Sequence, residues 1–583
     1  MLDRVEHVGE PLRGLGRADL GHQIRLSDFA ARAMRIEVET DVETPARDGT
    51  LLRADIYRPA GGGALPTLVR RTPYDKSLAV RTDVDVLRLV RAGYAVVVQD
   101  VRGRYASEGR FEPFRTEASD GADAVAWAAA QPWSSGAVGM VGASYEGMTQ
   151  WLAASAAPPA LRAIAPLVTS VDPYDGWAYQ GGAFELGFGL LWNAGNLASE
   201  PLAQDPRDDF EAAARRRPLR ELAPDAGLAG FHRDWLGHPG RDGWWEQLVP
   251  PERVGAVAVP ALSVGGWYDL FLRGTLAGHS RMRAHANGSR LVVGPWSHMV
   301  SGGVFPQRSY GWRAAADAVD LTGLHLRWFD RHLRGVENGV EREPAVRLFV
   351  MGADRWRDAD DWPLPGTAWT RFHLGGGGAL SAEAPGAGGE DAYRYDPRDP
   401  VPTAGGATFL PGQDVGACAG PLDQRAVQRR ADVLVYRTPP LERDVEVIGP
   451  VELVLYVSSS AVDTDFTGKL VDVHPDGRAE LLTDGILRAR WRESQSTPVP
   501  LVPGRVYELR VDLGATANVF RVGHRIGLEI SSSNFPRFDR NTNTGGTIAD
   551  EREEDVAVAV NRVHHGRAHP SHLMLPAIPA AQA

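Results

Sequence analysis

Cysteine is nearly missing from this sequence: Cys418 is the only one among 583 residues. One thiol cannot form an internal disulfide or a thiolate-rich zinc site, so no oxidising compartment is implied.

Long apolar runs are missing too. No stretch approaches the roughly 18 apolar residues that a membrane span needs, and residues 1–28 contain no apolar segment of the secretory type. We therefore expect a cytoplasmic protein with no membrane partner.

An excess of basic residues is also absent. The chain carries 63 Lys and Arg residues against 74 Asp and Glu residues, which gives a formal charge of −11. A nucleic-acid-binding protein needs a basic face. We therefore expect no nucleic-acid partner.

Recognisable metal-binding spacings are lacking as well. Three histidines near the C-terminus have no convincing acidic or thiolate partner: His564, His565 and His569. Three aspartates lack the glycine and the terminal glutamate of a calcium loop: Asp463, Asp465 and Asp472. We assign the histidines to the surface and the aspartates to turns, and expect neither a metal nor a cofactor.

What is present divides the chain into parts, because 583 residues exceed one hydrophobic core. Residues 34–171 and 255–343 alternate short apolar strands with helices, the pattern of a parallel sheet built from βαβ units. Between them, residues 172–254 are rich in Trp, Phe and Arg and are interrupted by prolines, which predicts an inserted helical cap. Residues 344–583 show short alternating or β-branched runs, which predict an all-β sandwich or jelly roll.

The most informative segment is Gly142-Ala-Ser-Tyr-Glu-Gly147, which follows a short apolar strand and precedes a helix. A serine at a tight strand-to-helix turn needs small neighbours, and its hydroxyl projects above the sheet. Ser144 is therefore a candidate nucleophile, although a serine that only caps the helix fits the same position. The motif departs from G-x-S-x-G because its second glycine comes one position late.

Two later strand ends supply partners for this serine in the order acid, then histidine. Asp269 follows the apolar segment 261–265, and His298 follows the strand 290–294. Asp269 would also serve as a helix cap and His298 as a structural histidine. Since three such residues stand in the right order at three strand ends, we predict Ser144 as nucleophile, His298 as base and Asp269 as its orienting carboxylate.

Taken together, these segments resemble the cocaine esterase and NonD (CocE/NonD) family of α/β-hydrolases, a relative of the X-prolyl dipeptidyl aminopeptidases. The resemblance runs from about Arg35 to Leu575 and includes the late second glycine. It rests on six segments: Thr72–Lys76, Gln99–Gly109, Gly142–Gly147, Gly265–Asp269, Gly294–His298 and Asp463–Val473. It implies an α/β-hydrolase core with an inserted helical cap and a C-terminal jelly roll. It also implies an oxyanion hole made by the Tyr74 hydroxyl and the Tyr145 amide.

The family divides among aryl esters, α-amino acid esters, β-lactam side-chain amides and X-Pro peptides. Its α-amino acid ester hydrolases carry an acidic pair just after the triad aspartate, where this chain has Leu270, Phe271 and Leu272. A buried ammonium needs a paired charge, so amino-group recognition is disfavoured, although Asp172 and Asp175 could still supply such a charge. Aromatic side chains of the cap either wall an apolar substrate pocket or pack the cap itself: Trp177, Tyr179, Phe184, Phe188 and Trp192.

We therefore predict a serine hydrolase that cleaves a small-molecule ester, or an amide, with an apolar acyl group through an acyl-enzyme. An X-prolyl dipeptidyl aminopeptidase and an α-amino acid ester hydrolase are the alternatives within the same chemistry. A catalytically inert binding module, with a sugar-binding jelly roll, is the alternative of another class. A homodimer is compatible with the sequence, which leaves the oligomeric state open.

Overall fold

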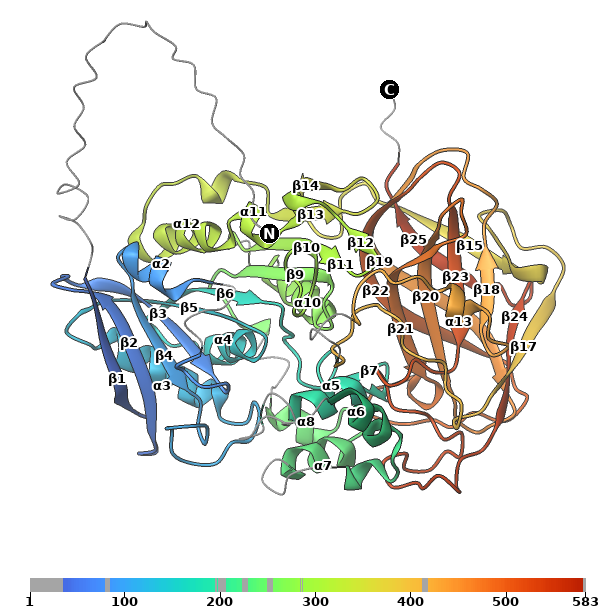
Figure 1. The fold of residues 1–583 in the computed structure, drawn as a ribbon, viewed down its shortest axis with the longest axis horizontal. Helices are drawn as coiled ribbons and strands as arrows, with labels where there is room; N and C mark the ends of the chain where they lie inside the picture. Colours follow the sequence, from blue (N-terminus) through green and yellow to red (C-terminus); the bar gives the residue numbers. More distant parts are fainter. Residues whose placement is uncertain are drawn as a thin grey trace, which may run out of the picture.

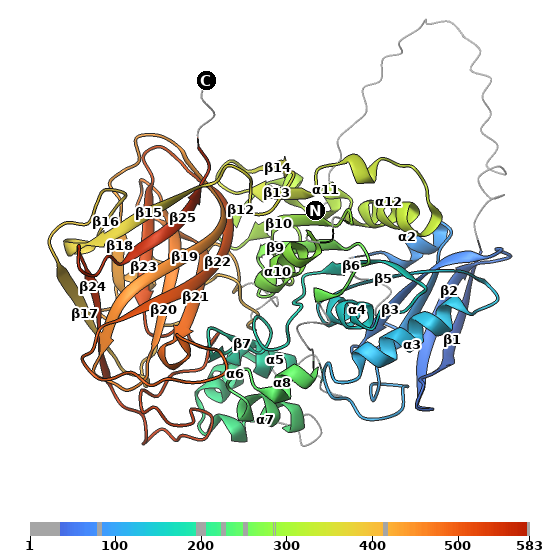
Figure 2. The same ribbon diagram turned by 180° about the vertical axis from the view of Figure 1, so that it is seen from behind.

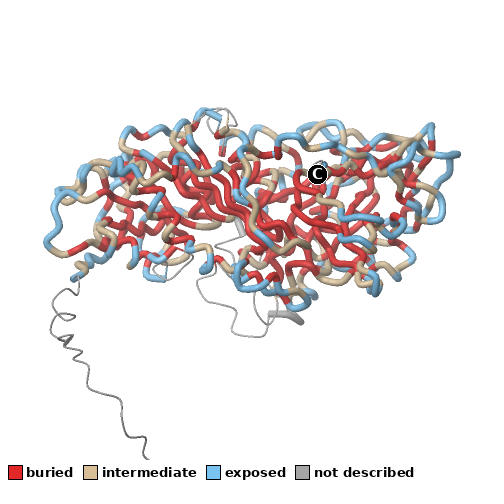
Figure 3. The backbone as a smooth tube through the Cα atoms, turned by 90° about the horizontal axis from the view of Figure 1, so that it is seen from above, coloured by how far each residue is buried: buried red, intermediate tan, exposed pale blue. Residues whose placement is uncertain are grey.

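The computed structural model describes residues 35–579 except for 79–83, 194–196, 198–205, 223–228, 249–254, 284, 286 and 412–417. A ten-stranded sheet with helices, a group of short helices and a β-domain lie next to one another (Figures 1 and 2). In Figure 3 the buried backbone runs as contiguous tracks through the sheet region and the β-domain, with exposed segments around them.

The ten-stranded sheet has the order β1-β2-β4-β3-β5-β6-β9-β10-β13-β14. Neighbours from β4 to β13 are parallel, and β1, β2 and β14 join antiparallel at the two edges. The bounds are β1 (Ile36–Pro45), β2 (Leu51–Pro59), β3 (Leu65–Thr72), β4 (Ala95–Asp100), β5 (Ser134–Ala143), β6 (Leu161–Leu167), β9 (Leu262–Tyr268), β10 (Arg290–Ser297), β13 (Val346–Val350) and β14 (Arg355–Ala359). Because helices cover both faces, the central strands are buried on both sides, as in β4, which is buried over its whole length, including Gln99 and Asp100.

Helices pack on both faces of this sheet. The helices α3 (Glu117–Ala129) and α4 (Tyr145–Ser155) share a core with Val97. The helices α2 (Val86–Arg91) and α12 (Leu321–Arg334) share a core with its neighbours Val96 and Val98. Successive residues of β4 thus face opposite layers, as strand geometry requires. The helix α10 (Leu272–Arg283) lies beside α4, where Gly278 approaches Trp151.

The cap is inserted between β6 and β9, and its described part contains the hairpin β7 (Tyr179–Gln180) and β8 (Ala183–Phe184) and several short helices. These are α5 (Leu186–Leu191), α6 (Pro206–Arg215), η2 (Leu219–Glu221), α7 (Ala229–Gly237) and α8 (Gly243–Leu248). They lie between the sheet and the β-domain (Figure 1). The predicted hydrolase core with an inserted helical segment is confirmed.

The β-domain is a second network of strands in the order β17-β24-β19-β25-β15-β16-β18-β23-β20-β21, with β22 paired to β19. Their bounds are β15 (Ala368–Gly375), β16 (Ala379–Ser381), β17 (Gly389–Tyr395), β18 (Leu434–Arg437), β19 (Val445–Ser459), β20 (Asp465–Val473), β21 (Ala479–Arg488), β22 (Tyr507–Phe520), β23 (Arg525–Ser531), β24 (Ala559–His565) and β25 (His572–Ala577). Side chains from most of these strands form one apolar core, and the predicted all-β C-terminal domain is confirmed.

The boundary between the two sheets lies later in the chain than predicted. The sequence analysis placed the start of the β-domain at residue 344, but β13 and β14 extend the hydrolase sheet to Ala359. The second sheet begins at β15, with Ala368. Leu291, Val292 and Val293 of β10 pair in parallel with β13. A β-branched run is compatible with either sheet, and only this pairing decides which one it joins.

No described helix is both long enough and apolar enough to cross a lipid bilayer.

A buried arginine connects the β-domain to the cap. Arg488, at the end of β21, is 3% exposed and donates to Asp465 at 3.0 Å and to Asp539 at 2.7 Å. Its backbone amide donates to the cap carbonyl of Gly181, and the amide of Phe184 donates to Asp539. One guanidinium therefore neutralises two buried carboxylates at the point where cap and β-domain meet.

We predict that Arg488→Met lowers the free energy of unfolding by about 3–5 kcal/mol, because two buried carboxylates lose their counter-charge. Urea denaturation followed by tryptophan fluorescence measures the change. Arg510→Met is the matched control, because Arg510 pairs with Glu452 on the surface and such pairs contribute less than about 1 kcal/mol. Equal losses in the two variants would contradict the assignment.

Candidate active site

Ser144 lies at the turn between β5 and α4, with φ 59° and ψ −125°. Its amide donates to the carbonyl of Leu167 at 2.9 Å, so the turn is tied to the neighbouring strand β6. A non-glycine residue at positive φ is strained, and such strain gathers at functional sites. The fold therefore lifts this one hydroxyl above the carboxyl edge of the sheet.

Both glycines of the turn are required because a side chain at either position would clash with a neighbouring residue. A Cβ at Gly142 would lie 2.6 Å from the side chain of Glu146, and a Cβ at Gly147 would lie 2.6 Å from Thr169. Glu146 stands where the more familiar motif has glycine, and here it is buried in an ion pair with Arg70 at 2.5 Å. The second glycine comes one position late because it is residue 147 of α4 that packs against the chain following β6.

The structure brings Ser144, His298 and Asp269 together. The His298 Nε2 atom lies 3.0 Å from Ser144 Oγ, and its Nδ1 atom lies 2.8 Å from Asp269 Oδ1. Asp269 follows β9 and His298 follows β10, and both side chains are at most 9% exposed. With a proton on Nδ1 held by the carboxylate, Nε2 is left as the acceptor for the serine proton. This arrangement can remove a proton from the hydroxyl and return it.

Two candidate oxyanion donors lie next to Ser144: the amide of Tyr145, which follows it in the chain, and the hydroxyl of Tyr74, which is hydrogen-bonded to it. Tyr145 is the first residue of α4, so its amide has no acceptor within the helix. Its ring is buried in the core, with the hydroxyl donating to Glu117 at 3.0 Å and accepting from the amide of Phe114. Only the amide of Tyr145 is therefore available to a ligand.

Tyr74 supplies the second donor. Burial raises the pKa of its hydroxyl, and this effect outweighs the opposing hydrogen bonds with Trp192 and Ser144. Trp192 Nε1 donates to the Tyr74 oxygen at 2.9 Å. Because the indole is a donor to the Tyr74 oxygen, the Tyr74 proton can be donated to another acceptor, and the Ser144 hydroxyl lies within hydrogen-bonding reach of it. The sequence analysis did not assign this role to Trp192, and no local signal indicates it.

The loop that carries Tyr74 is anchored by charge. Lys76 Nζ lies 2.8 Å from Asp41 and 3.2 Å from Asp100, and the Lys76 amide donates to Asp100 at 2.8 Å. Arg104 donates to the carbonyl of Pro73. The segments Thr72–Lys76 and Gln99–Gly109, which the sequence offered as separate similarities, thus hold one another.

Aromatic rings surround the imidazole. Phe271 and Phe409 lie edge-on to His298, with ring centroids 5.2 and 5.4 Å away. Trp177 stacks on Phe271 at 4.2 Å, and Phe188 contacts both Phe271 and Phe409. Trp177 and Phe188, which the sequence analysis singled out, therefore lie in this aromatic wall.

Two aromatic positions differ from expectation. Phe184 packs on Tyr179 and His232 inside the cap and has no ring contact with His298 or Phe271 among the described residues. Its predicted pocket role is thus not supported by its position. Phe409, in contrast, was missed, because it reaches the site from the β-domain and nothing in its local sequence marks it.

The two acidic residues at the start of the cap differ in their partners. Asp172 pairs with Arg241 at 2.5 Å and is neutralised by it. Asp175 lies 3.8 Å from Arg273, which pairs more closely with Asp512 at 2.9 Å, and the Asp175 Oδ1 atom is buried without a hydrogen-bond partner in the described part of the chain.

Comparison with known proteins agrees with this fold. The family model for X-Pro dipeptidyl-peptidase (S15 family) matches residues 48–300, and that for the X-Pro dipeptidyl-peptidase C-terminal non-catalytic domain matches residues 338–574. Cocaine esterase from Rhodococcus sp. (strain MB1 Bresler) is 45% identical over 574 residues, covering 93% of this chain and 98% of that protein.

Solved structures show the same architecture. A selenomethionine-labelled α-amino acid ester hydrolase has a TM-score of 0.82 at 27% identity, covering 96% of this chain and 100% of its own. An aminopeptidase from a marine sediment Thaumarchaeota archaeon has a TM-score of 0.80 at 26% identity, covering 94% and 97%. The chain therefore belongs to the CocE/NonD family of α/β-hydrolases, which is related to the X-Pro dipeptidyl-peptidases.

Proposed function

We propose that this protein is a serine esterase that cleaves carboxylic esters with a neutral, apolar acyl group through an acyl-enzyme on Ser144. The observation that carries the proposal is the imidazole of His298, which lies within hydrogen-bonding distance of both Ser144 Oγ and Asp269 Oδ1. A serine hydroxyl is a weak nucleophile until such a base takes its proton.

In the acylation step, Ser144 Oγ attacks the ester carbonyl carbon and its proton passes to His298 Nε2. Asp269 stabilises the imidazolium and keeps the ring oriented. The carbonyl oxygen becomes an oxyanion that accepts hydrogen bonds from the Tyr145 amide and the Tyr74 hydroxyl. When the intermediate collapses, the bond to the leaving oxygen breaks and His298 protonates the departing alcohol.

In the deacylation step, water takes the place of the serine. His298 removes a proton from the water, and the resulting oxygen attacks the acyl carbon in the same oxyanion site. Collapse releases the carboxylic acid and returns the proton to Ser144 Oγ. Atoms balance as ester plus water giving acid plus alcohol.

The acyl preference follows from the surroundings of His298. The aromatic wall of Phe271, Phe409, Trp177 and Phe188 offers apolar surface. A charged α-ammonium placed there would be desolvated without a partner, because none of these four rings carries a charge and Asp172 already pairs with Arg241. This supports ester hydrolysis of neutral acyl groups over the X-prolyl dipeptidyl aminopeptidase and α-amino acid ester hydrolase alternatives, although the matching family model carries the X-Pro dipeptidyl-peptidase name.

The first prediction tests the nucleophile against the inert-module alternative. Ser144→Ala should lose roughly 10⁴-fold or more in kcat, because the acyl-enzyme cannot form. A fluorescent fluorophosphonate should label the unaltered protein at Ser144 and leave the variant unlabelled. Hydrolysis of 4-nitrophenyl esters and mass spectrometry of the labelled peptide measure both effects. Absence of label on the unaltered protein would favour the binding module.

The second prediction concerns the oxyanion donor. Tyr74→Phe should lower kcat by about 10²–10³-fold with a smaller change in KM, because the donor acts mainly on the developing oxyanion. Because burial raises the pKa of Tyr74, the unaltered enzyme should not lose this proton as the pH rises to about 10. Tyr456→Phe in the β-domain, whose hydroxyl binds Glu508 on the surface, is the control that should stay fully active.

The third prediction concerns substrate charge. At about pH 6.5 a free α-amino group is mostly protonated. The 4-nitrophenyl ester of 3-phenylpropionate should then exceed that of phenylalanine by about tenfold or more in kcat/KM, since the two differ only in the ammonium group. Equal turnover, or cleavage of an X-Pro anilide at a rate similar to the ester, would contradict the proposed specificity.

A further inference from the structure

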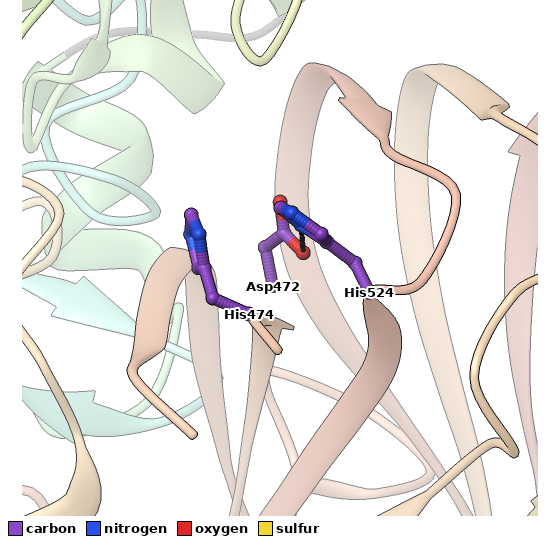
Figure 4. Close-up of side chains that lie close together, drawn as sticks. All are labelled: Asp472, His474 and His524. Atoms are coloured by element: carbon purple, nitrogen blue, oxygen red, sulfur yellow. Dashed lines mark hydrogen bonds and ion pairs between the residues drawn. The ribbon is translucent and has the colours of Figure 1, made fainter. Parts of the chain in front are cut away.

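A cluster of metal-ligating side chains lies in the β-domain, outside the catalytic site. Asp472, His474 and His524 each offer one nitrogen or oxygen atom, and these three atoms lie within 4.8 Å of one another. Figure 4 shows the carboxylate between the two rings, with the Nδ1 atom of His524 on Asp472 Oδ1 at 2.9 Å. The ring centroids of the two histidines are 4.4 Å apart.

Strand register places these residues together. Asp472 is the next-to-last residue of β20, His474 follows that strand, and His524 immediately precedes β23, whose first residue pairs with Val473. On the other side of β20, Asp472 pairs directly with Glu480 of β21. The cluster is thus built on the ends of three hydrogen-bonded strands, which hold its backbone rigidly.

Glu480 is a fourth candidate ligand. Its side chain is 7% exposed, and its Oε2 atom lies 3.5 Å from His474 Nε2. That oxygen is buried without a hydrogen-bond partner among the described residues, although it lies 3.0 Å from Arg478 as an ion pair. Two carboxylates facing each other across a strand pair repel, so the cluster favours a cation between them.

The ligand set fits a borderline divalent cation. Two imidazoles with one or two carboxylates form a common donor set for Zn²⁺, with bonds of about 2.0–2.2 Å. Tetrahedral ligands at that distance are about 3.3 Å apart, close to the spacing found here between Asp472 and His524 and between His474 and Glu480. The histidine side chains are 14% and 22% exposed, so the cluster is open to an ion from solution.

We propose that Asp472, His474 and His524, with Glu480 beside them, form a binding site for a divalent transition-metal ion such as Zn²⁺. The ion displaces the proton shared by His524 Nδ1 and Asp472, and it binds carboxylate oxygen and imidazole nitrogen. Arg478 is the competitor, because its guanidinium lies 3.0 Å from His474 Nε2 and must swing toward solvent. Asp472 lies within β20 and not in a turn, which corrects its sequence-based assignment.

The site also bears on the junction between the two sheets. Glu480 lies 3.7 Å from Arg308 of β12 (Arg308–Ser309), which belongs to the hydrolase part and also pairs with Asp354. A bound ion would hold Glu480 and its strand in place against this arginine. We therefore expect an effect on stability rather than on ester turnover.

The experiment is a titration of the metal-free full-length protein with ZnCl₂, followed by calorimetry and by competition with a fluorescent zinc chelator. We expect one equivalent to bind to the unaltered protein and raise its Tm. His524→Ala and His474→Gln should each weaken binding by about tenfold or more. Arg478→Gln should strengthen it several-fold, because a competing donor and a positive charge are removed.

His564→Ala is the matched control. His564 contacts Glu390 and His569 in the same domain, but these residues do not gather three ligand atoms in the described structure. Cobalt substitution adds a readout of coordination, since a nitrogen-ligated Co²⁺ ion gives visible absorption bands that His474→Gln should change even if His524→Ala folds poorly. Unchanged affinity in both His474→Gln and His524→Ala, loss of binding in His564→Ala, or absence of stoichiometric binding would each overturn the proposal.

Discussion

The hydrogen bond between Ser144 Oγ and His298 Nε2 depends on one constraint of the sheet. β5, β9 and β10 run parallel, so the chain leaves all three at the same edge. β6 lies between β5 and β9. The imidazole of His298 therefore bridges the hydroxyl that follows β5 and the carboxylate that follows β9. A change that shifted the register of β9 against β10 would move Asp269 relative to His298 without altering either side chain.

Charged side chains hold the segments around this edge. Lys76 fixes the loop of Tyr74 through ion pairs with Asp41 and Asp100, and Glu117 accepts a hydrogen bond from the Tyr145 hydroxyl. Arg488 joins the cap hairpin to the β-domain. These contacts join segments distant in sequence, and removing one partner from a fully buried pair, such as Arg488 with Asp539, would be costly.

Much of the hydrolase core could be predicted because its signals are local. A tight turn needs glycines, and apolar strands alternating with helices need a covered parallel sheet. The order of Ser144, Asp269 and His298 along the chain was enough to place them at one edge. The position of Tyr74 came only from resemblance, because a tyrosine after a strand has many other roles.

The features that could not be predicted from the sequence depend on pairing between segments that lie far apart in the chain. The sequence of β13 is compatible with either sheet, and only its pairing with β10 shows that it belongs to the hydrolase sheet. Phe184 and Phe188 are both cap aromatics four residues apart, yet the first packs on His232 inside the cap and the second packs on Phe271 beside His298. Asp472 and His524 are separated by 51 intervening positions and meet only because β20 pairs with β23.

The contact between Phe409 and His298 joins the two domains at the candidate site. A ring from the β-domain packs against the imidazole that the hydrolase core positions. Under the proposed function, selectivity would therefore be distributed: a substitution at residue 409 would alter which acyl groups fit while the reacting atoms stay in place. On that proposal, exchanging the C-terminal domain between relatives would carry part of their specificity with it.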